Sequence, residues 1–120
     1  MNQRHERVRK LLLKEISKII LEEIQDPNIG FLTVVHVDLA KDLGFARVYY
    51  SVMGSAKEIR QTEEAINEHA REIKRLVNQS INLKYAIDLA FIRDEGLNNL
   101  SRVEQIFDEI KKQKPSEPAS

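Results

Sequence analysis

Residues 30–54 constrain the fold more than any other stretch, because they predict two β-strands joined by a short polar loop. Segments 31–38 and 45–53 are rich in the β-branched and aromatic residues that strands favour. In the second segment, apolar and more polar positions alternate, which predicts one buried and one wetter face. Its apolar positions are Ala46, Val48, Tyr50 and Val52. The first segment is apolar on both sides, so its pattern does not say which face is buried.

Length and composition limit the possible classes of protein. A chain of 120 residues is large enough for one hydrophobic core, which predicts a single domain. Nineteen basic and nineteen acidic residues balance, so any attraction to nucleic acid must come from local patches of charge. The chain has no cysteine, which excludes disulfides and thiolate metal sites and is consistent with a cytoplasmic protein. No apolar run approaches the length of a membrane span, and the N-terminus does not resemble a signal peptide.

The N-terminal segment 3–25 predicts an amphipathic helix that ends at Asp26-Pro27. Apolar residues recur at steps of three and four, at Val8, Leu12, Ile16, Ile19, Ile20 and Ile24. At about 100° per residue, four basic residues fall on the opposite side. We call Arg7, Lys10, Lys14 and Lys18 the basic stripe. Its pattern is compatible with a phosphate-binding surface and equally with an ordinary solvated helix face.

A second helix is predicted after the strand pair. Ser55 and Glu58 have the spacing of a capping box, and helical periodicity continues to about residue 78. Its expected core face consists of Ile59, Ile66, Ala70, Ile73 and Val77. No helix-breaking residue interrupts it, which predicts one continuous helix. Basic residues gather toward its end, near a further lysine, and give a second candidate surface of Arg71, Lys74, Arg75 and Lys84.

The C-terminal part predicts one more strand and one more helix. Apolar residues alternate through segment 83–93, and a strand reached through a long helix should lie parallel to the strand before it. Helical spacing then returns over about 97–112, at Leu97, Leu100, Val103, Phe107 and Ile110. The last residues, 114–120, contain two prolines and no apolar periodicity, which predicts a disordered tail. The expected domain therefore spans residues 1–113.

Nothing in the sequence favours catalysis. His5, His36 and His69 are scattered over different predicted elements. His36 and Asp38 share one side of a strand, but a metal or catalytic site needs at least one further group. The serines lack a nucleophile signature and there is no phosphate-binding glycine loop of the Walker type. We predict a protein that is not an enzyme and has no metal or cofactor.

Several long blocks resemble one family of bacterial proteins. These blocks are QDPNIGFLTVVHVDLAKDLGFARVYYSVMG, AINEHAREIKRLVNQSINLKYAIDLAF and LSRVEQIFDEI. Through these blocks, the sequence resembles the ribosome-binding factor A family from about residue 8 to residue 110. The resemblance implies an α+β, KH-like fold of type II, with the order αββααβ and a three-stranded mixed sheet covered on one face by helices. The family's Ala-x-Gly kink should fall at His69-Ala70-Arg71, where neither its alanine nor its glycine is in place.

The resemblance also implies a function. It implies a monomeric assembly factor that binds the immature small (30S) ribosomal subunit and its 16S rRNA. The factor would promote late rRNA maturation and 5′-end processing, a role tied to cold adaptation. The basic stripe and the second candidate surface are the RNA-binding residues that we would assign. Two alternatives stay open: a KH-like module for single-stranded RNA, which would need a flexible glycine-rich loop, and a protein-interaction module without RNA.

Overall fold

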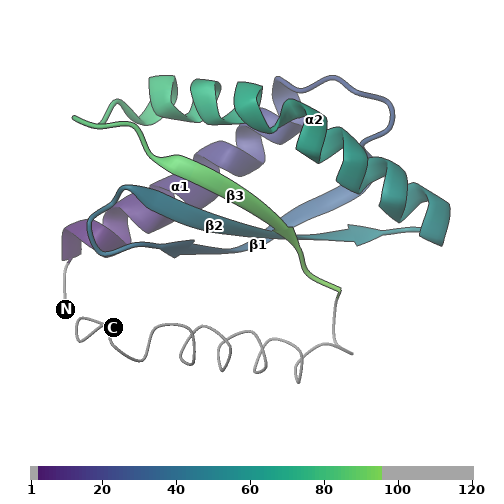
Figure 1. Ribbon diagram of the computed structural model, residues 1–120, viewed down its shortest axis with the longest axis horizontal. Helices are drawn as coiled ribbons and strands as arrows, with labels where there is room; N and C mark the ends of the chain where they lie inside the picture. Colours follow the sequence, from purple (N-terminus) through teal and green to yellow (C-terminus); the bar gives the residue numbers. More distant parts are fainter. Residues whose placement is uncertain (1–2, 96–120) are drawn as a thin grey trace.

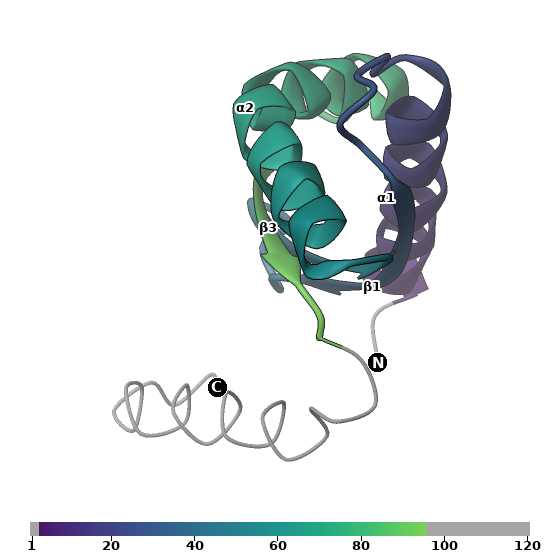
Figure 2. The same ribbon diagram turned by 90° about the vertical axis from the view of Figure 1, so that its right-hand side faces the viewer.

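The computed structural model describes residues 3–95, which form two helices and three strands in the order α1, β1, β2, α2, β3. Their bounds are α1 Gln3–Glu22, β1 Phe31–Leu39, β2 Phe45–Met53, α2 Ala56–Ile81 and β3 Asp88–Arg93. The sheet has the order β1-β2-β3, with β1 antiparallel and β3 parallel to the central β2. Both helices lie on the same face of this sheet (Figures 1 and 2). The predicted α+β, KH-like class with a three-stranded mixed sheet is confirmed.

The core lies between the helices and the sheet. The predicted apolar stripe of α1 is buried, and α1 packs mainly on β1 while α2 packs mainly on β3. In β2, Ala46, Val48 and Tyr50 are buried and face the helices, as their alternation predicts. Burial raises the pKa of Tyr50 to about 12, so its hydroxyl stays neutral inside the domain. The polar face of β2 therefore lies on the side of the sheet away from the helices.

A β-bulge in β1 explains why this strand is apolar on both sides. The pairing register with β2 shifts between Val34 and His36, which leaves Val35 as an extra residue. Before the bulge, Leu32 and Val34 pack against the core, and after it Val37 and Leu39 do so. The buried positions thus change from even to odd numbers within one strand. Val35 itself is 44% exposed.

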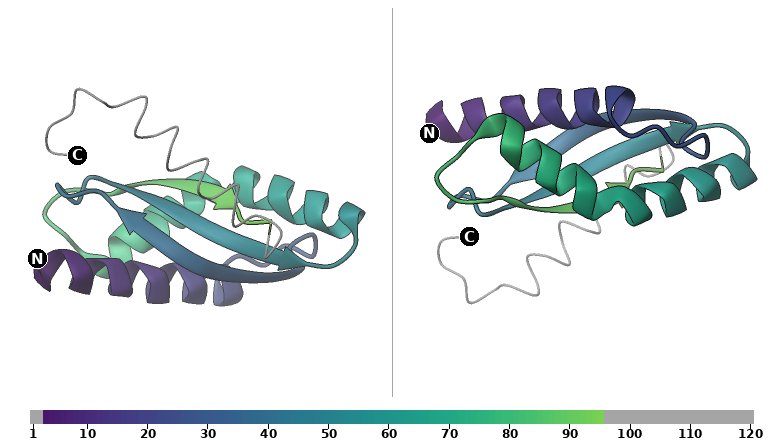
Figure 3. Two further views of the ribbon diagram at one scale, coloured as in Figure 1. Left: turned by 90° about the horizontal axis from the view of Figure 1, so that it is seen from below. Right: turned by 90° about the horizontal axis from the view of Figure 1, so that it is seen from above.

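Helix α2 is a single uninterrupted helix that bends partway along its length (Figure 3). The predicted capping box is present: the Ser55 hydroxyl accepts from the Glu58 N–H, and the Glu58 carboxylate accepts from the Ser55 N–H. The helix extends a few residues beyond the predicted end and closes at Asn82 in the left-handed conformation, with φ 49°. Among residues 3–95 the order is therefore αββαβ, with one bent helix where the family pattern has two.

The loop after α1 is attached to α2 by two polar side chains. Thr62 is fully buried, and its hydroxyl accepts from the Gly30 N–H and lies within hydrogen-bond distance of the Asn28 and Glu58 carbonyls. About two turns further along α2, His69 Nε2 lies 2.9 Å from Asp26 Oδ2. The loop from Asp26 to Gly30 is thus fixed against α2 at two separate points.

The third strand begins later than predicted. It starts at Asp88 instead of residue 83, because its register partner in β2 is Phe45, the first residue of that strand. Residues 83–87 have no strand beside them, and Tyr85, which belongs to the alternating apolar series, is 74% exposed. Helix α1 likewise ends at Glu22, short of the predicted residue 25. The predicted helix 97–112 and tail 114–120 lie outside the described residues.

Candidate nucleic-acid interface

The basic stripe forms an exposed face on α1. Arg7, Lys10, Lys14 and Lys18 are all exposed, on the side of the helix opposite its buried residues. Arg7, Lys14 and Lys18 form no ion pair with any group in residues 3–95. The stripe therefore presents positive charge to the solvent, and its replacement would remove nothing from the core.

A neighbouring arginine on α1 is already occupied. Arg9 donates two hydrogen bonds to the Glu6 carboxylate, with distances of 2.9 Å and 2.6 Å. This contact, with a weaker attraction from Lys10, holds the pKa of Glu6 below its usual range. Arg9 is therefore held by Glu6 and does not belong to the basic stripe.

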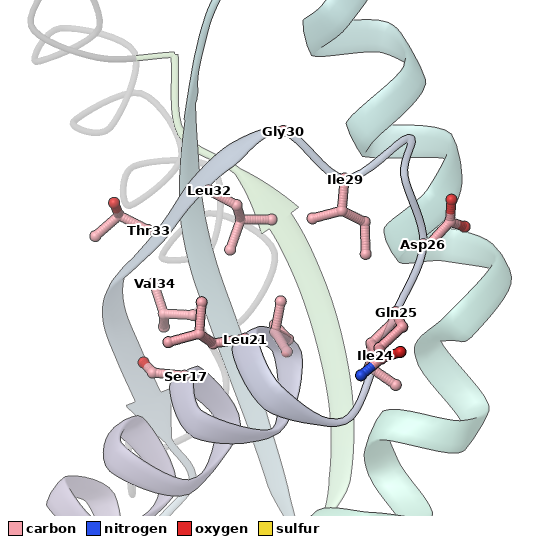
Figure 4. Close-up of a pocket in the computed structure, with 11 residues that line it drawn as sticks. Ser17, Leu21, Ile24, Gln25, Asp26, Ile29, Gly30, Leu32, Thr33 and Val34 are labelled. Atoms are coloured by element: carbon pink, nitrogen blue, oxygen red, sulfur yellow. The ribbon is translucent and has the colours of Figure 1, made fainter.

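An apolar hollow lies at the C-terminal end of α1 (Figure 4). Leu21 follows Lys14 by seven residues, so it continues the line of the stripe, and it is 82% exposed. It borders a hollow of about 410 Å³ between α1, the following loop and β1, which Ile24, Leu32 and Val34 also line. Sequence reasoning missed this feature, although an isolated leucine at the seven-residue spacing of the basic face was a signal for it.

The second candidate surface is assembled only in part. Arg71, Lys74 and Arg75 line a hollow of about 560 Å³ near the end of α2. Asn78, Gln79 and Ala86 complete its lining. Lys84 does not line the hollow, and its ammonium lies 5.4 Å from the centroid of the Tyr85 ring. We call Arg71, Lys74 and Arg75 the α2 basic group.

The members of the α2 basic group differ in their surroundings. Lys74 Nζ lies 3.0 Å from Asp88 Oδ1, and this contact lowers the pKa of Asp88. Part of the Lys74 charge is thereby compensated. Arg71 and Arg75 are exposed and form no ion pair with residues 3–95, so they carry most of the net positive charge of the group.

Asn78 shapes the floor of this hollow. Its side-chain amide donates to the carbonyls of Lys74 and Ile87, and its amide oxygen accepts from the Ile87 N–H at 2.8 Å. Ile87 is fully buried, so these hydrogen bonds satisfy backbone groups that water cannot reach. Asn78 thus ties the end of α2 to the segment that enters β3. No local sequence pattern indicates this role of Asn78.

Both basic groups belong to the helix layer. Ser80, near the end of α2, donates to the Glu15 carboxylate of α1 at 2.5 Å, so the end of α2 lies against the middle of α1. On the opposite side of the molecule, Arg47 is occupied by Asp38 at 3.3 Å and lies over the ring of Phe45. Positive charge without an acidic partner is therefore concentrated on the helices, within the part of the chain that the structure describes.

Residues 3–95 contain no candidate for a metal site or a membrane span. No group of three or more histidine, aspartate or glutamate side chains there is placed to hold a metal ion. Neither of the two described helices combines the length and the apolar character needed to cross a membrane. The described chain is thus a small KH-like α+β domain whose helix layer carries two exposed basic groups. Basic groups clustered on one layer of a small domain are a pattern typical of nucleic-acid-binding proteins.

Comparisons with known proteins narrow this class. The family model for ribosome-binding factor A matches residues 4–107. Ribosome-binding factor A of Halothermothrix orenii is 35% identical over 115 residues, which cover 96% of this chain and 94% of that protein. The chain therefore belongs to the ribosome-binding factor A family.

Solved structures agree with this membership. The solution structure of a putative ribosome binding factor A from Thermotoga maritima matches with a TM-score of 0.66 and 27% identity, over 81% of this chain and 94% of that one. A homology model of the Thermus thermophilus factor, fitted into the cryo-EM map of a 30S complex, matches with a TM-score of 0.51 and 20% identity, over 78% and 93% of the two chains. At that identity, the second likeness shows the fold alone.

Proposed function

We propose that this protein is a non-catalytic assembly factor that binds the immature small (30S) ribosomal subunit and promotes late maturation of its 16S rRNA, including processing of the 5′ end. The family match over residues 4–107 carries this proposal. The Thermus thermophilus relative fitted into a 30S complex supports the choice of the small subunit. The protein would act in the cytoplasm, as a monomer, and a requirement at low temperature would follow from a role in RNA folding.

The geometry supports binding to folded RNA through phosphates. Lysine and arginine supply affinity by displacing counterions, and the shape of the protein surface supplies selectivity for a folded RNA. The basic stripe and the α2 basic group would contact phosphates, with Lys84 as a peripheral contact. Both groups lie on helices, whose backbone is already ordered before binding. Binding therefore costs little backbone conformational entropy.

A KH-like module for single-stranded RNA is less well supported. Such modules clamp the nucleotide backbone with a Gly-x-x-Gly loop between two helices. Here the corresponding region lies inside α2, which contains no glycine and is uninterrupted from Ala56 to Ile81. This helix cannot provide the close approach of backbone to RNA on which that loop depends.

Fractionation of cell extract on a sucrose gradient tests the proposal. We expect the protein to sediment with free small subunits and to be absent from large subunits and translating ribosomes. Depletion of the protein should cause 16S rRNA with an unprocessed 5′ end to accumulate in the small-subunit fractions. Equal recovery with large subunits, or recovery with neither particle, would contradict the proposal.

A further inference from the structure

The face of the sheet away from the helices carries exposed apolar side chains. Phe31 and Met53 are direct register partners on β1 and β2, and they are 82% and 77% exposed. Their strand neighbours Leu32 and Val52 pack against the core, so alternation directs Phe31 and Met53 to the opposite face. Two large apolar residues side by side in water are an unusual feature for a folded domain.

Further apolar side chains lie on the same face of the sheet, beyond the polar register pair Thr33 and Ser51. Tyr49 pairs with His36 on one side, with ring centroids 5.8 Å apart, and with Ile92 of β3 on the other. Four residues along β2 separate Tyr49 from Met53, which is about 13 Å at the usual strand rise. We call Phe31, Tyr49, Met53 and Ile92 the open sheet face. Among residues 3–95, no helix covers it (Figure 3, left).

The described chain ends beside this surface. After β3, the Asp94 N–H donates to the Tyr50 carbonyl at 2.6 Å, which holds the chain against β2 up to that point. Tyr50 is the strand neighbour of Tyr49 and lies three residues from Met53. The last described residues, Asp94 and Glu95, therefore lie close to the open sheet face.

The following segment has the pattern needed to cover such a face. Its apolar residues, at steps of three and four, would form one stripe of a helix from Leu97 to Ile110. Fourteen helical residues span about 20 Å, which is enough to cross the open sheet face. The family model also continues through residue 107, so residues 97–107 of this segment belong to the matched family region.

We propose that residues 97–110 form an amphipathic helix that packs on the open sheet face, with its apolar stripe against Phe31, Tyr49, Met53 and Ile92. The short connection gives the segment an effective concentration in the millimolar range, far above that of a second copy in solution. The sheet would then be covered on both faces, and both basic groups of the helix layer would remain accessible on the other side. This inference does not depend on the proposed function.

Spin labelling of the full-length chain tests the inference directly, because the sequence has no cysteine. We would label Met53→Cys, and in a second sample the exposed Thr33→Cys on the same face, and record amide line broadening for residues 97–110. The matched control is Glu64→Cys, an exposed position on α2 across the sheet. We expect strong broadening from both sheet labels and none from the control. Absence of broadening from the sheet labels would overturn the inference.

A mixed sample identifies the origin of the broadening. Isotope-labelled chain without a spin label is combined with spin-labelled chain that carries no isotope. The inference predicts no broadening here, and broadening would mean that a second copy covers the face, which overturns it. Phe107→Asp in the spin-labelled, isotope-labelled chain should release the segment and relieve the broadening. Persistent broadening in that variant would also contradict packing through the apolar stripe.

Discussion

His69 is held between two carboxylates, which makes its protonation part of the stability of the domain. Its Nε2 lies 2.9 Å from Asp26, and its Nδ1 lies 3.4 Å from Glu72. The hydrogen bond with Asp26, followed by that with Glu72, raises the pKa of His69 above its usual 6.5. Asp26 is affected in the opposite sense, since the Asn28 N–H and then His69 lower its pKa below 3.8.

We predict that the free energy of unfolding decreases as the pH rises from about 6 to about 9. The folded protein binds the His69 proton more tightly than the unfolded chain does. The stabilisation is therefore complete below pH 6.5 and is lost as the pH rises through the raised pKa of folded His69. For Asp26 the sign is reversed, and its contribution is lost as the pH falls below 3.8 through its lowered pKa. Urea unfolding between about pH 6 and about pH 9 measures the His69 effect, and the same measurement below about pH 4 measures the Asp26 effect.

Substitution of either partner provides the control for this prediction. His69→Gln should flatten the decrease in stability between about pH 6 and about pH 9. Asp26→Asn should have a similar effect, while it keeps an oxygen that can accept from the Asn28 N–H. Because the two residues form one contact, the double variant should lose less than the sum of the single variants. Simple additivity would show that the two side chains do not interact in solution.

Asn78 is the second residue whose substitution should have a large effect. Asn78→Ala removes three hydrogen bonds and leaves the buried N–H and carbonyl of Ile87 without partners. We expect a loss of about 1–3 kcal/mol in the free energy of unfolding. The neighbouring Gln79 is exposed, so Gln79→Ala should stay within about 0.5 kcal/mol. Denaturant unfolding compares the two, and an equally mild effect at both positions would refute the role of Asn78.

At the scale of elements, we expect the two sides of α1 to serve folding and binding separately. Its buried side holds the core, and its exposed side carries the basic stripe. Replacement of all four stripe residues by glutamine should therefore leave the unfolding transition nearly unchanged, because exposed charges contribute weakly to stability. Binding to small subunits should be lost at physiological salt. If the stripe makes four phosphate contacts, the salt slope should flatten by roughly three units, at about 0.7–0.9 per contact.

The outer face of α2 provides a control for this experiment. Glu64 and Glu68 are exposed, and their neutralisation should leave binding unchanged or slightly stronger. Reversal of charge at Lys10 and Lys14 alone should already weaken binding. Normal binding of the fourfold variant, with an unchanged salt slope, would make the basic stripe a solvated face. The α2 basic group would then be the leading candidate for contact with RNA.

The C-terminal segments should differ sharply in their importance for stability. Removal of residues 114–120 should change the free energy of unfolding by no more than about 0.5 kcal/mol, because this tail has no apolar side chain pattern to bury. A chain that stops at Leu100 lacks Val103, Phe107 and Ile110. Loss of each buried side chain of this size costs about 2–5 kcal/mol. Thermal unfolding of both truncations tests this, and a fully stable shorter chain would disprove a role for segment 101–113 in the fold.

Elements defined by local chemistry could be predicted from the sequence. The capping box at Ser55 and Glu58 and the alternation in β2 depend on residues close in sequence, and both are present. The bulge at Val35 and the start of β3 could not be predicted, because each depends on the register with β2. Apolar residues alternate in the sequence before Asp88 as well. However, β3 begins only at Asp88, where β2 begins to provide a pairing partner.

In the candidate site, too, features set by local sequence could be predicted, and contacts between distant segments could not. The exposure of the basic stripe follows from helical periodicity alone, and the structure places all four residues as the periodicity predicts. The contact between Lys74 and Asp88 and the role of Asn78 depend on how the chain returns from α2 to β3. Lys84 is nine residues from Arg75 in sequence, yet the same return path directs it away from the hollow. Contacts between segments that are distant in the sequence could not be predicted from local patterns.

At the scale of the whole molecule, we predict a monomer in solution. The core is closed by α1, α2 and the sheet of one chain, and its largest side chains, such as Leu12, Ile66 and Ile73, are fully buried. If residues 97–110 cover the open sheet face, no large apolar surface remains for a second copy. Sedimentation equilibrium at low micromolar concentration should give the mass of one chain. A dimer at that concentration would contradict this prediction and the packing inferred for the C-terminal segment.

The bulge at Val35 also bears on how this protein avoids aggregation. β1 is an edge strand, so one side of its backbone lacks a neighbouring strand among residues 3–95. Open edges recruit strands from other unfolded or partly folded chains. An extra residue in the middle of the edge breaks the regular spacing of its N–H and carbonyl groups and increases the local twist. A foreign strand can therefore align with only half of β1, which disfavours edge-to-edge association of this domain with other chains.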